Sequence, residues 1–394
     1  MDELNPASEE ARILSQGQQA LQELLGTEWR VEQRADDADH GDAGWDALLE
    51  VRSPGNGIFT ELLVDVRTRV TPKDVVGHLS STAMLLRRLN RNTHLMIFAP
   101  WISPRTQEEL RRRGIDYLDL TGNISLRVSQ PAIVIHTHGA DRAPASHRAP
   151  SNKPLLMGAR AGRLVRLLAD VTPPYRATDL ARHAGLSVSY VSRLLDALED
   201  QLLIARQGKA VDDVNWAELL RTRASHLDLM RLDPVGYLAP NGIQAVVQRL
   251  SDRADQMHRN NVLVTGSHAA RSVAPIAVGG QLMLYALPLE EHRQHLAKAL
   301  GLLPVSEGAD VLMLQPADSS VLHRPRIEGF WQVGLSQLVL DCLSGPGRTP
   351  AEGEKVLEYM GRNEDTWRIP SLDALAGLEA RRPPQNSPDD TALF

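Results

Sequence analysis

Residues 162–211 read GRLVRLLADVTPPYRATDLARHAGLSVSYVSRLLDALEDQLLIARQGKAV, and this stretch carries the clearest structural pattern of the chain. Leucine and valine recur at helical spacing over 164–168, which predicts a first helix with one apolar face. Pro173 and Pro174 then stop that helix, because proline lacks the backbone N–H and clashes with the preceding turn. A second, shorter helix is expected over 178–183.

The second half of the same stretch predicts a third helix and a hairpin. Gly185 marks a tight turn, and Ser187 is placed to cap the helix that follows. The apolar positions of this helix fall on one side, namely Val191, Leu194, Leu195 and Leu198. Polar positions fall on the other side, namely Ser189, Tyr190, Ser192 and Arg193. A strand at 202–204 and a Gln-Gly-Lys turn at 207–209 indicate a basic wing.

Three helices followed by a basic hairpin are typical of a winged helix-turn-helix, whose third helix enters the DNA major groove. An ordinary three-helix packing unit with a solvated polar face is the alternative. Residues 151–211 carry nine Lys or Arg against five Asp or Glu, a net charge of +4 in a chain whose net charge is −6. This local basic excess, together with the serine-rich start of the third helix, favours DNA binding.

The third helix and the wing supply the candidate DNA-binding residues. In such modules the start of the third helix meets base edges, and flanking cations meet phosphates. Ser189, Tyr190 and Arg193 are therefore assigned to the groove, and Arg206 and Lys209 to the DNA backbone. The full set of candidates is Thr178, Ser187, Ser189, Tyr190, Ser192, Arg193, Arg206 and Lys209.

Composition excludes several other classes of protein. The chain has 394 residues, 42% of them hydrophobic and 23% charged, as in soluble globular proteins. Its one cysteine, Cys342, excludes an intramolecular disulfide framework and lies in an apolar helical run, where a buried thiol is expected. No apolar run approaches the ~20 residues of a membrane helix. A cytoplasmic protein with no cofactor, no metal site and no membrane contact is predicted.

The fold class predicted is a multidomain α/β (α+β) protein. The chain is longer than a domain with a single hydrophobic core, and a Pro- and Ser-rich stretch separates two α/β regions. The predicted segments are a nuclease-like α/β sandwich at 1–142, a linker at 143–156, the winged helix at 157–222, a nucleotidyltransferase-like α/β domain at 223–372, and a disordered tail at 373–394.

The first α/β region is expected to alternate helices and strands. Helices are predicted over 9–25, 72–89 and 104–113, and strands over 29–33, 47–51, 62–66, 94–99, 117–120 and 124–128. Asp119, Gly122 and Asn123 fall between the last two strands. A structural role in a turn is expected for them.

Two aspartates in this region resemble the metal site of PD-(D/E)XK nucleases, in which two acids hold Mg²⁺ and a lysine steadies the attacking water. The resemblance implies that Asp46 and Asp65 take the acidic positions, with Arg67 where the lysine belongs. An arginine stays protonated and cannot act as a base. A nuclease-like fold without activity is therefore favoured. An active nuclease and an unrelated α/β domain, with Asp65 and Arg67 as ordinary strand neighbours, are the alternatives.

The third region opens with VLVTGSHAAR at 262–271, a strand leading through Gly266-Ser267 into a helix. This looks like the phosphate-cradling turn of nucleotidyltransferases. Those enzymes need paired carboxylates for their metal ions, and the matching strand at 281–286 has none. Asp310 and Asp318 stand alone, so no transferase activity is expected. His268, His292, His295 and His323 show no metal-ligand spacing.

With VGLSQLVLDCLSGPGRTPAEGEKVLEYM at 333–360, the winged helix and the Gly-Ser turn resemble the AbiEi family of antitoxins and transcriptional regulators. The resemblance covers mainly residues 160–365. It implies a DNA-binding winged helix followed by an inactive nucleotidyltransferase-like domain. It also implies repression at the protein's own operon and a toxin protein as a possible partner.

The leading functional hypothesis is a sequence-specific regulator that binds double-stranded promoter DNA as a homodimer. Winged-helix regulators commonly bind two half-sites, which is why two-fold symmetry is expected. One alternative is a Mg²⁺-dependent DNA nuclease targeted by the winged helix, with Asp46 and Asp65 as metal ligands. The other is the antitoxin of a type IV toxin–antitoxin pair.

Overall fold

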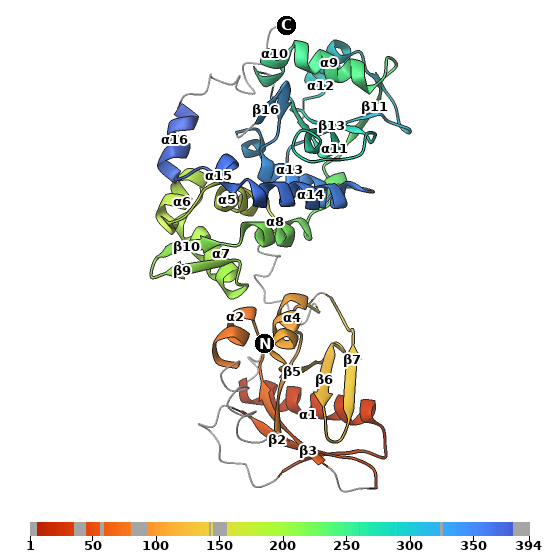
Figure 1. Ribbon diagram of the computed structural model, residues 1–394, viewed down its shortest axis with the longest axis vertical. Helices are drawn as coiled ribbons and strands as arrows, with labels where there is room; N and C mark the ends of the chain where they lie inside the picture. Colours follow the sequence, from red (N-terminus) through yellow and green to blue (C-terminus); the bar gives the residue numbers. More distant parts are fainter. Residues whose placement is uncertain are drawn as a thin grey trace. The chain divides into compact units, whose positions relative to one another are not determined.

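A computed structural model (Figure 1) describes residues 6–34, 45–55, 59–79, 93–141, 143–144, 156–259, 261–287, 289–323 and 326–380. The chain forms two compact units, and the first passes into the second between residues 152 and 153. Both units mix helices and sheets, so the expected multidomain α/β class is confirmed.

The first unit is built on a seven-stranded sheet whose strands follow one another in chain order. These strands are β1 (Arg30–Gln33), β2 (Ala47–Arg52), β3 (Phe59–Val66), β4 (Thr93–Ala99), β5 (Asp116–Asp119), β6 (Ile124–Val128) and β7 (Ile133–Thr137). The β3–β4 and β4–β5 pairs are parallel and the other pairs are antiparallel. The edge strand β7 was not predicted from the sequence, although its IVIHT pattern alternates as an edge strand does.

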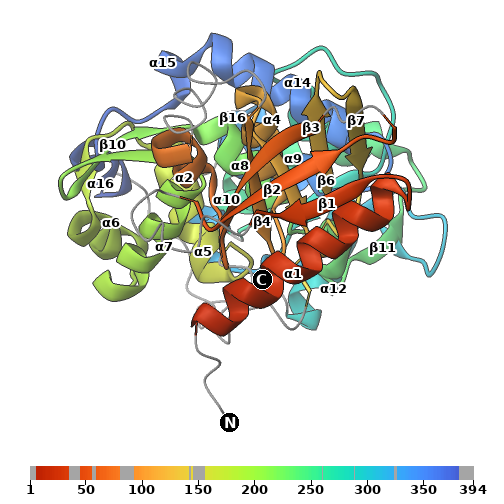
Figure 2. The same ribbon diagram turned by 90° about the horizontal axis from the view of Figure 1, so that it is seen from below.

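Helices cover both faces of this sheet and make a three-layer sandwich. On one face lies α1 (Pro6–Leu25), which buries Ile13 and Leu21 against the strands (Figure 2). On the other lie α2 (Pro72–Asp74), the π-helical turn η2 (Val75–Leu79) and α4 (Pro104–Arg113), which enclose a second core. The helix expected over 72–89 thus begins as predicted, and its part from residue 80 lies outside the described residues.

Asp119 organises the turn between β5 and β6. Its carboxylate is buried and accepts hydrogen bonds from the backbone N–H groups of Ile102, Thr121 and Asn123, at 2.9, 2.9 and 3.1 Å. Gly122 has a φ of 99°, a conformation that glycine adopts readily. The structural role expected for Asp119, Gly122 and Asn123 is therefore confirmed.

The second unit begins with the predicted winged helix. Its elements are α5 (Ala159–Asp170), β8 (Tyr175–Arg176), α6 (Ala177–Ala184), α7 (Val188–Asp200), β9 (Ile204–Gln207) and β10 (Ala210–Val214). The three strands form a sheet in the order β8-β10-β9. The strand expected at 202–204 starts two residues later, because Leu202, with a φ of 54°, belongs to the turn after α7.

The rest of this unit surrounds a second seven-stranded sheet, in the order β14-β11-β15-β13-β12-β17-β16. Its strands are β11 (Val235–Leu238), β12 (Leu263–Thr265), β13 (Leu282–Tyr285), β14 (Leu303–Pro304), β15 (Val311–Leu314), β16 (Arg326–Glu328) and β17 (Phe330–Gln332). Its helices are α8 (Trp216–Ala224), η4 (Leu229–Arg231), α9 (Ile243–Asp252), α10 (Ala254–Arg259), α11 (Gly266–Ala270), α12 (Glu290–Leu300), η5 (Ser319–His323), α13 (Leu335–Leu343), α14 (Thr349–Arg362), α15 (Glu364–Trp367) and α16 (Leu372–Ala380).

The winged helix and the C-terminal region share one hydrophobic core. Helices α13 and α14 lie beside α5 and α8 (Figure 1), and one continuous set of buried residues runs through all four. Ile369 also forms two backbone hydrogen bonds with the end of α5, to Thr172 and Asp170 at 2.8 and 2.7 Å. The two segments predicted as 157–222 and 223–372 are therefore parts of one compact unit, because α8 packs against both.

The predicted start of the disordered tail, residue 373, falls inside a helix. Residues 372–380 form α16, which buries Leu372 and Leu375. These two leucines give the segment an apolar side to pack, and the proline- and aspartate-rich composition begins only at residue 381. Residues 381–394 and most of the predicted linker at 143–156 lie outside the described residues.

Candidate nucleic-acid interface

The third helix of the winged helix, α7, has one buried and one open side. Val191, Leu194, Leu195 and Leu198 are buried, as predicted. Ser187 accepts a hydrogen bond from the backbone N–H of Tyr190 at 3.4 Å, which caps the helix. Ser189 and Arg193 are exposed one turn apart, and the Arg193 Nε donates to the Ser189 carbonyl at 3.4 Å. The N-terminal half of α7 therefore presents polar groups to solvent.

The turn before α7 has the geometry that the sequence predicts. Gly185 caps the C-terminal end of α6 with a left-handed φ of 63°, and the Leu186 N–H donates to the Ala181 carbonyl at 2.9 Å. A Cβ at this position would lie 3.4 Å from the Arg163 guanidinium. Because this distance is an ordinary van der Waals contact, the left-handed backbone conformation is the reason for glycine at this position.

The wing is a two-stranded hairpin with a cation at its tip. Gln207 pairs with Ala210, and Gly208, with a φ of 62°, makes the turn between them. Lys209 is exposed beside this turn. Arg206 forms an ion pair with Asp196 of α7, at 2.7 Å, and its side chain is only 23% exposed. Arg206 therefore ties the wing to α7.

The remaining candidates lie around this surface. Thr178 is exposed in the first turn of α6, and Ser192 is partly buried on α7. Tyr190 is half-buried and packs against the core, although the helical pattern placed it among the polar positions. The assignment of these eight residues to DNA stays a prediction.

The charge count included nine cations in the basic surface, but the structure places two of them elsewhere. Arg166 is 9% exposed and donates to Gln337 at 2.8 Å, and Arg163 pairs with Asp318 at 2.6 Å. Both arginines lie on the side of α5 that meets the C-terminal region. Asp196, by contrast, lies on the open side of α7 and was not singled out, although its position three residues after Arg193 places it on that side.

A buried carboxylate lies behind the winged helix. Asp341 of α13 is 3% exposed and accepts hydrogen bonds from Thr265, Tyr285 and Gln337, at 2.6, 2.8 and 2.6 Å. Burial raises the pKa of Asp341 to about 6, against the opposing effect of these hydrogen bonds. Gln337 also accepts from Arg166, so α5, β12, β13 and α13 meet in one polar network.

In the first unit, Asp46 and Asp65 lie near each other but are engaged within the protein. Asp46 accepts from the backbone N–H of Val66 at 2.6 Å. Both oxygens of Asp65 accept from Arg67, at 2.6 and 2.8 Å. Burial raises the pKa of Asp65 and outweighs the lowering by Arg67. Within the described part of the chain, no group of three or more His, Cys, Asp or Glu side chains could hold a metal ion.

Removal of the Arg67 guanidinium should destabilise the first unit. Arg67→Ala leaves the buried Asp65 carboxylate without its cation, and we expect a loss of about 2 kcal/mol in the free energy of unfolding. Urea unfolding, followed by hydrogen exchange of peptides from β3, measures the change. Arg30→Ala in strand β1 is the control. Equal stability of the two variants would show that the ion pair is energetically neutral.

The Gly-Ser turn of the C-terminal region is closed by a carboxylate. The Ser267 hydroxyl donates to Glu352 of α14 at 2.5 Å, and Glu352 also pairs with Arg348 at 2.9 Å. Asp310 accepts from the backbone N–H of Ala239 at 3.0 Å, which fixes a loop. The Ser267 hydroxyl is therefore engaged by Glu352, which a phosphate at this turn would have to displace.

The geometry of α6, α7 and the wing defines a helix-turn-helix of the DNA-binding class. A family model described as the IclR helix-turn-helix domain matches residues 159–208, from the start of α5 to the turn of the wing. No curated protein and no solved structure matches the chain. The match supports a DNA-binding transcriptional regulator. The AbiEi, nuclease and nucleotidyltransferase resemblances find no counterpart in it and stay predictions.

None of the helices in the described ranges is long and apolar enough to span a membrane. Cys342 is fully buried in α13, and burial raises the pKa of its thiol, so the thiol is the inert group that the sequence indicated.

Proposed function

We propose that this protein is a sequence-specific regulator of transcription that binds double-stranded promoter DNA through α7 and the wing. The observation that carries the proposal is the exposed polar start of α7 beside a basic hairpin, in a segment that matches a DNA-binding family. Ser189 and Arg193 would reach base edges, and Lys209 would contact a phosphate. In this arrangement Arg206 positions the wing against α7.

The proposal is tested by fluorescence anisotropy with two duplexes, one from the region upstream of the gene and one with the same bases scrambled. Tight binding to the first duplex alone, weakened by salt, is the expected result. Equal affinity for both duplexes would contradict sequence-specific recognition. Absence of binding to either would contradict the function as a whole.

We further propose that the regulator acts as a homodimer, since two α7 helices related by a two-fold axis match two half-sites of a palindrome. Sedimentation of the protein with its duplex measures the number of chains bound. Two protected half-sites about one helical turn apart are expected in a footprint. A single protected half-site bound by one chain would exclude the dimeric arrangement.

The nuclease and antitoxin hypotheses make different predictions. Because Arg67 occupies both oxygens of Asp65, Mg²⁺ should leave the duplex intact on a denaturing gel. Cleavage that disappears in the Asp65→Ala variant would establish the nuclease instead. The antitoxin role requires that a neighbouring gene encodes a toxin and that this toxin co-purifies with the chain.

Asp196 provides a test of which side of α7 faces DNA. Asp196→Asn removes a negative charge beside Arg193 and releases Arg206 from its ion pair. We expect roughly threefold to tenfold tighter binding to both duplexes at low salt, because phosphate contacts are electrostatic. The pair is largely solvent-exposed at Asp196, so stability should change by less than about 1 kcal/mol.

The matched control for this measurement is Asp252→Asn, which removes an exposed carboxylate of α9 in the same unit. Its affinity for both duplexes should equal that of the unmodified protein. If Asp196→Asn behaves like the control, the C-terminal half of α7 lies outside the interface.

A further inference from the structure

A cavity of about 620 Å³ lies in the C-terminal region, outside the winged helix. The helix α12 forms one part of its wall, and the strands β11 and β14 with adjoining residues form the rest. Both α12 and β11 contact β14, which is the last strand at one edge of the sheet. A cavity of this size accommodates a small organic molecule.

Most of the lining of this cavity is apolar. The apolar lining residues are Val235, Pro240, Ala297, Leu302, Leu303 and Pro304. Leu303 is 54% exposed, although it is a large hydrophobic residue. Covering apolar surface that is open to water is favourable. The cavity therefore favours a ligand with an aliphatic body.

Tyr237 of β11 adds a hydrogen-bond donor to the lining. The residue is only 5% exposed, and its hydroxyl forms no hydrogen bond with any residue that the structure describes. Burial raises the pKa of Tyr237, and the charges of Arg293 and Glu290 act on it as well, so the hydroxyl lies near the first turns of α12. Buried hydroxyl groups normally have partners. A ligand oxygen at this end of the cavity would accept a hydrogen bond from Tyr237.

Lys298 adds a cation toward the other end of α12. It lies two turns after Glu290, which is about 12 Å along the helix. Lys298 is exposed and forms no ion pair within the described parts of the chain. Glu290, in contrast, accepts hydrogen bonds from Gln294 and Arg293, at 2.9 and 2.5 Å, and these bonds lower its pKa. The charge of Glu290 is thus balanced by Arg293, whereas the charge of Lys298 is open to a ligand.

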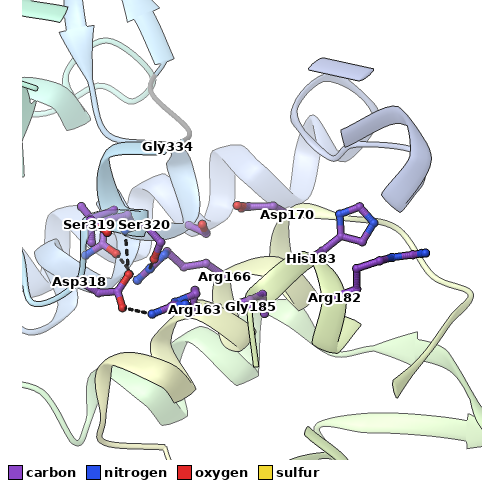
Figure 3. Close-up of a pocket in the computed structure, with 14 residues that line it drawn as sticks. Arg163, Arg166, Asp170, Arg182, His183, Gly185, Asp318, Ser319, Ser320 and Gly334 are labelled. Carbon is purple, nitrogen blue, oxygen red and sulfur yellow. Dashed lines mark hydrogen bonds and ion pairs between the residues drawn. The ribbon is translucent and has the colours of Figure 1, made fainter. Parts of the chain in front are cut away.

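The cavity of about 290 Å³ between the winged helix and the C-terminal region is different, because its arginines already have partners (Figure 3). Arg163 is held by Asp318, Arg166 by Gln337 and Arg182 by Asp179. The positive charge of that cavity is taken up within the protein. An anionic ligand is therefore expected beside Lys298 instead.

We propose that the cavity beside α12 binds a medium-chain aliphatic carboxylate that carries a second oxygen at its far end. The carboxylate pairs with Lys298, the aliphatic chain covers Leu303 and its apolar neighbours, and the far oxygen accepts a hydrogen bond from Tyr237. This arrangement matches a lining that has one donor near each end of α12 and apolar side chains elsewhere. The site involves neither α7 nor the wing, so it does not rest on the proposed DNA-binding function.

Isothermal titration calorimetry of the full chain at low ionic strength tests the site. The probes are 8-hydroxyoctanoate, octanoate, which lacks the far hydroxyl, and 1,8-octanediol, which lacks the charge. We expect 8-hydroxyoctanoate to bind most tightly. Octanoate loses the hydrogen bond from Tyr237 and octanediol loses the ion pair with Lys298, so each should bind about threefold to tenfold more weakly.

Two variants assign the two ends of the ligand. Tyr237→Phe keeps the ring and removes the hydroxyl, so this variant should bind 8-hydroxyoctanoate no better than octanoate. Lys298→Gln removes the exposed charge and should bind 8-hydroxyoctanoate no better than octanediol. Lys355→Gln removes an exposed lysine of α14, outside the cavity, and is the control that should bind all three probes as the unmodified protein does.

The expected order of the three probes, abolished by both cavity variants and kept by the control, supports the site. Absence of binding of all three probes overturns it. Binding that Tyr237→Phe and Lys298→Gln leave unchanged also overturns it, because the probes would then bind elsewhere. Equal affinity of the unmodified protein for the three probes contradicts the two-ended arrangement and overturns the proposal as well.

Discussion

Arg193→Ala should lower the ratio of specific to scrambled DNA affinity by roughly tenfold to a hundredfold. A bidentate contact from an arginine to a base edge contributes about 1–3 kcal/mol of discrimination. Arg193 is exposed on the polar side of α7, one turn after Ser189 and in the N-terminal half of the helix, where such contacts are made. Its loss should therefore weaken binding to the upstream duplex far more than binding to the scrambled one.

Lys209→Ala is the comparison that distinguishes a base contact from a phosphate contact. Lys209 lies at the tip of the wing, where a cation contacts phosphates of any sequence. Its loss should weaken binding to both duplexes alike and reduce the salt dependence by about one counterion. Anisotropy titrations at several salt concentrations measure both effects, with Lys355→Ala on α14 as the control. Equal losses of discrimination from Arg193→Ala and Lys209→Ala would remove the division of roles.

Asp341→Ala should have the largest effect on stability, a loss of about 3–5 kcal/mol in the free energy of unfolding of the second unit. The change leaves the donors of Thr265, Tyr285 and Gln337 buried without their acceptor. Urea unfolding, read by pulsed hydrogen exchange of α13 peptides, measures the loss. Asp373→Ala on α16 is the control. A loss below about 1 kcal/mol would show that this network is not a stabilising element.

The same carboxylate predicts a pH dependence of stability. Burial raises the pKa of Asp341 to about 6 from its ordinary 3.8, so the folded protein holds this proton more tightly than the unfolded chain. The stability from this group is fully present below pH 3.8 and is lost as the pH rises through 6, a change of about 3 kcal/mol. Asp341→Asn cannot titrate, and its unfolding free energy should lack this decline. A parallel pH profile for both proteins would contradict the shifted pKa.

Much of the winged helix was predictable because its signals are local. Pro173 and Pro174 end a helix, Gly185 supplies a left-handed turn, and the leucines of α7 recur at helical spacing. Each of these residues determines the backbone conformation or the burial of positions only a few residues away in the sequence. The missed strand β7 is different, since its five residues form a strand by pairing with β6, whose own position depends on the whole sheet.

The position of the candidate interface was predictable from the sequence, but the side-chain ion pairs within it were not. Helical spacing places Arg193 on the open side of α7, and the structure agrees. Periodicity cannot show that Arg206 pairs with Asp196, because the two residues belong to different elements that meet only after folding. For the same reason the charge count placed Arg163 and Arg166 on a basic surface, whereas packing against the C-terminal region turns both inward.

The sequence by itself determined the helix-turn-helix and the α/β character of the chain, because caps, turns and apolar periodicity are properties of neighbouring residues. Tertiary structure alone decided that the winged helix and the C-terminal region form one unit around Asp341 and Arg166. It also decided that Glu352 closes the Gly-Ser turn, and that the buried Ser336 hydroxyl has no hydrogen-bond partner among the residues that the structure describes. These features depend on side chains far apart in the chain, and their desolvation and pairing are set only when the elements pack.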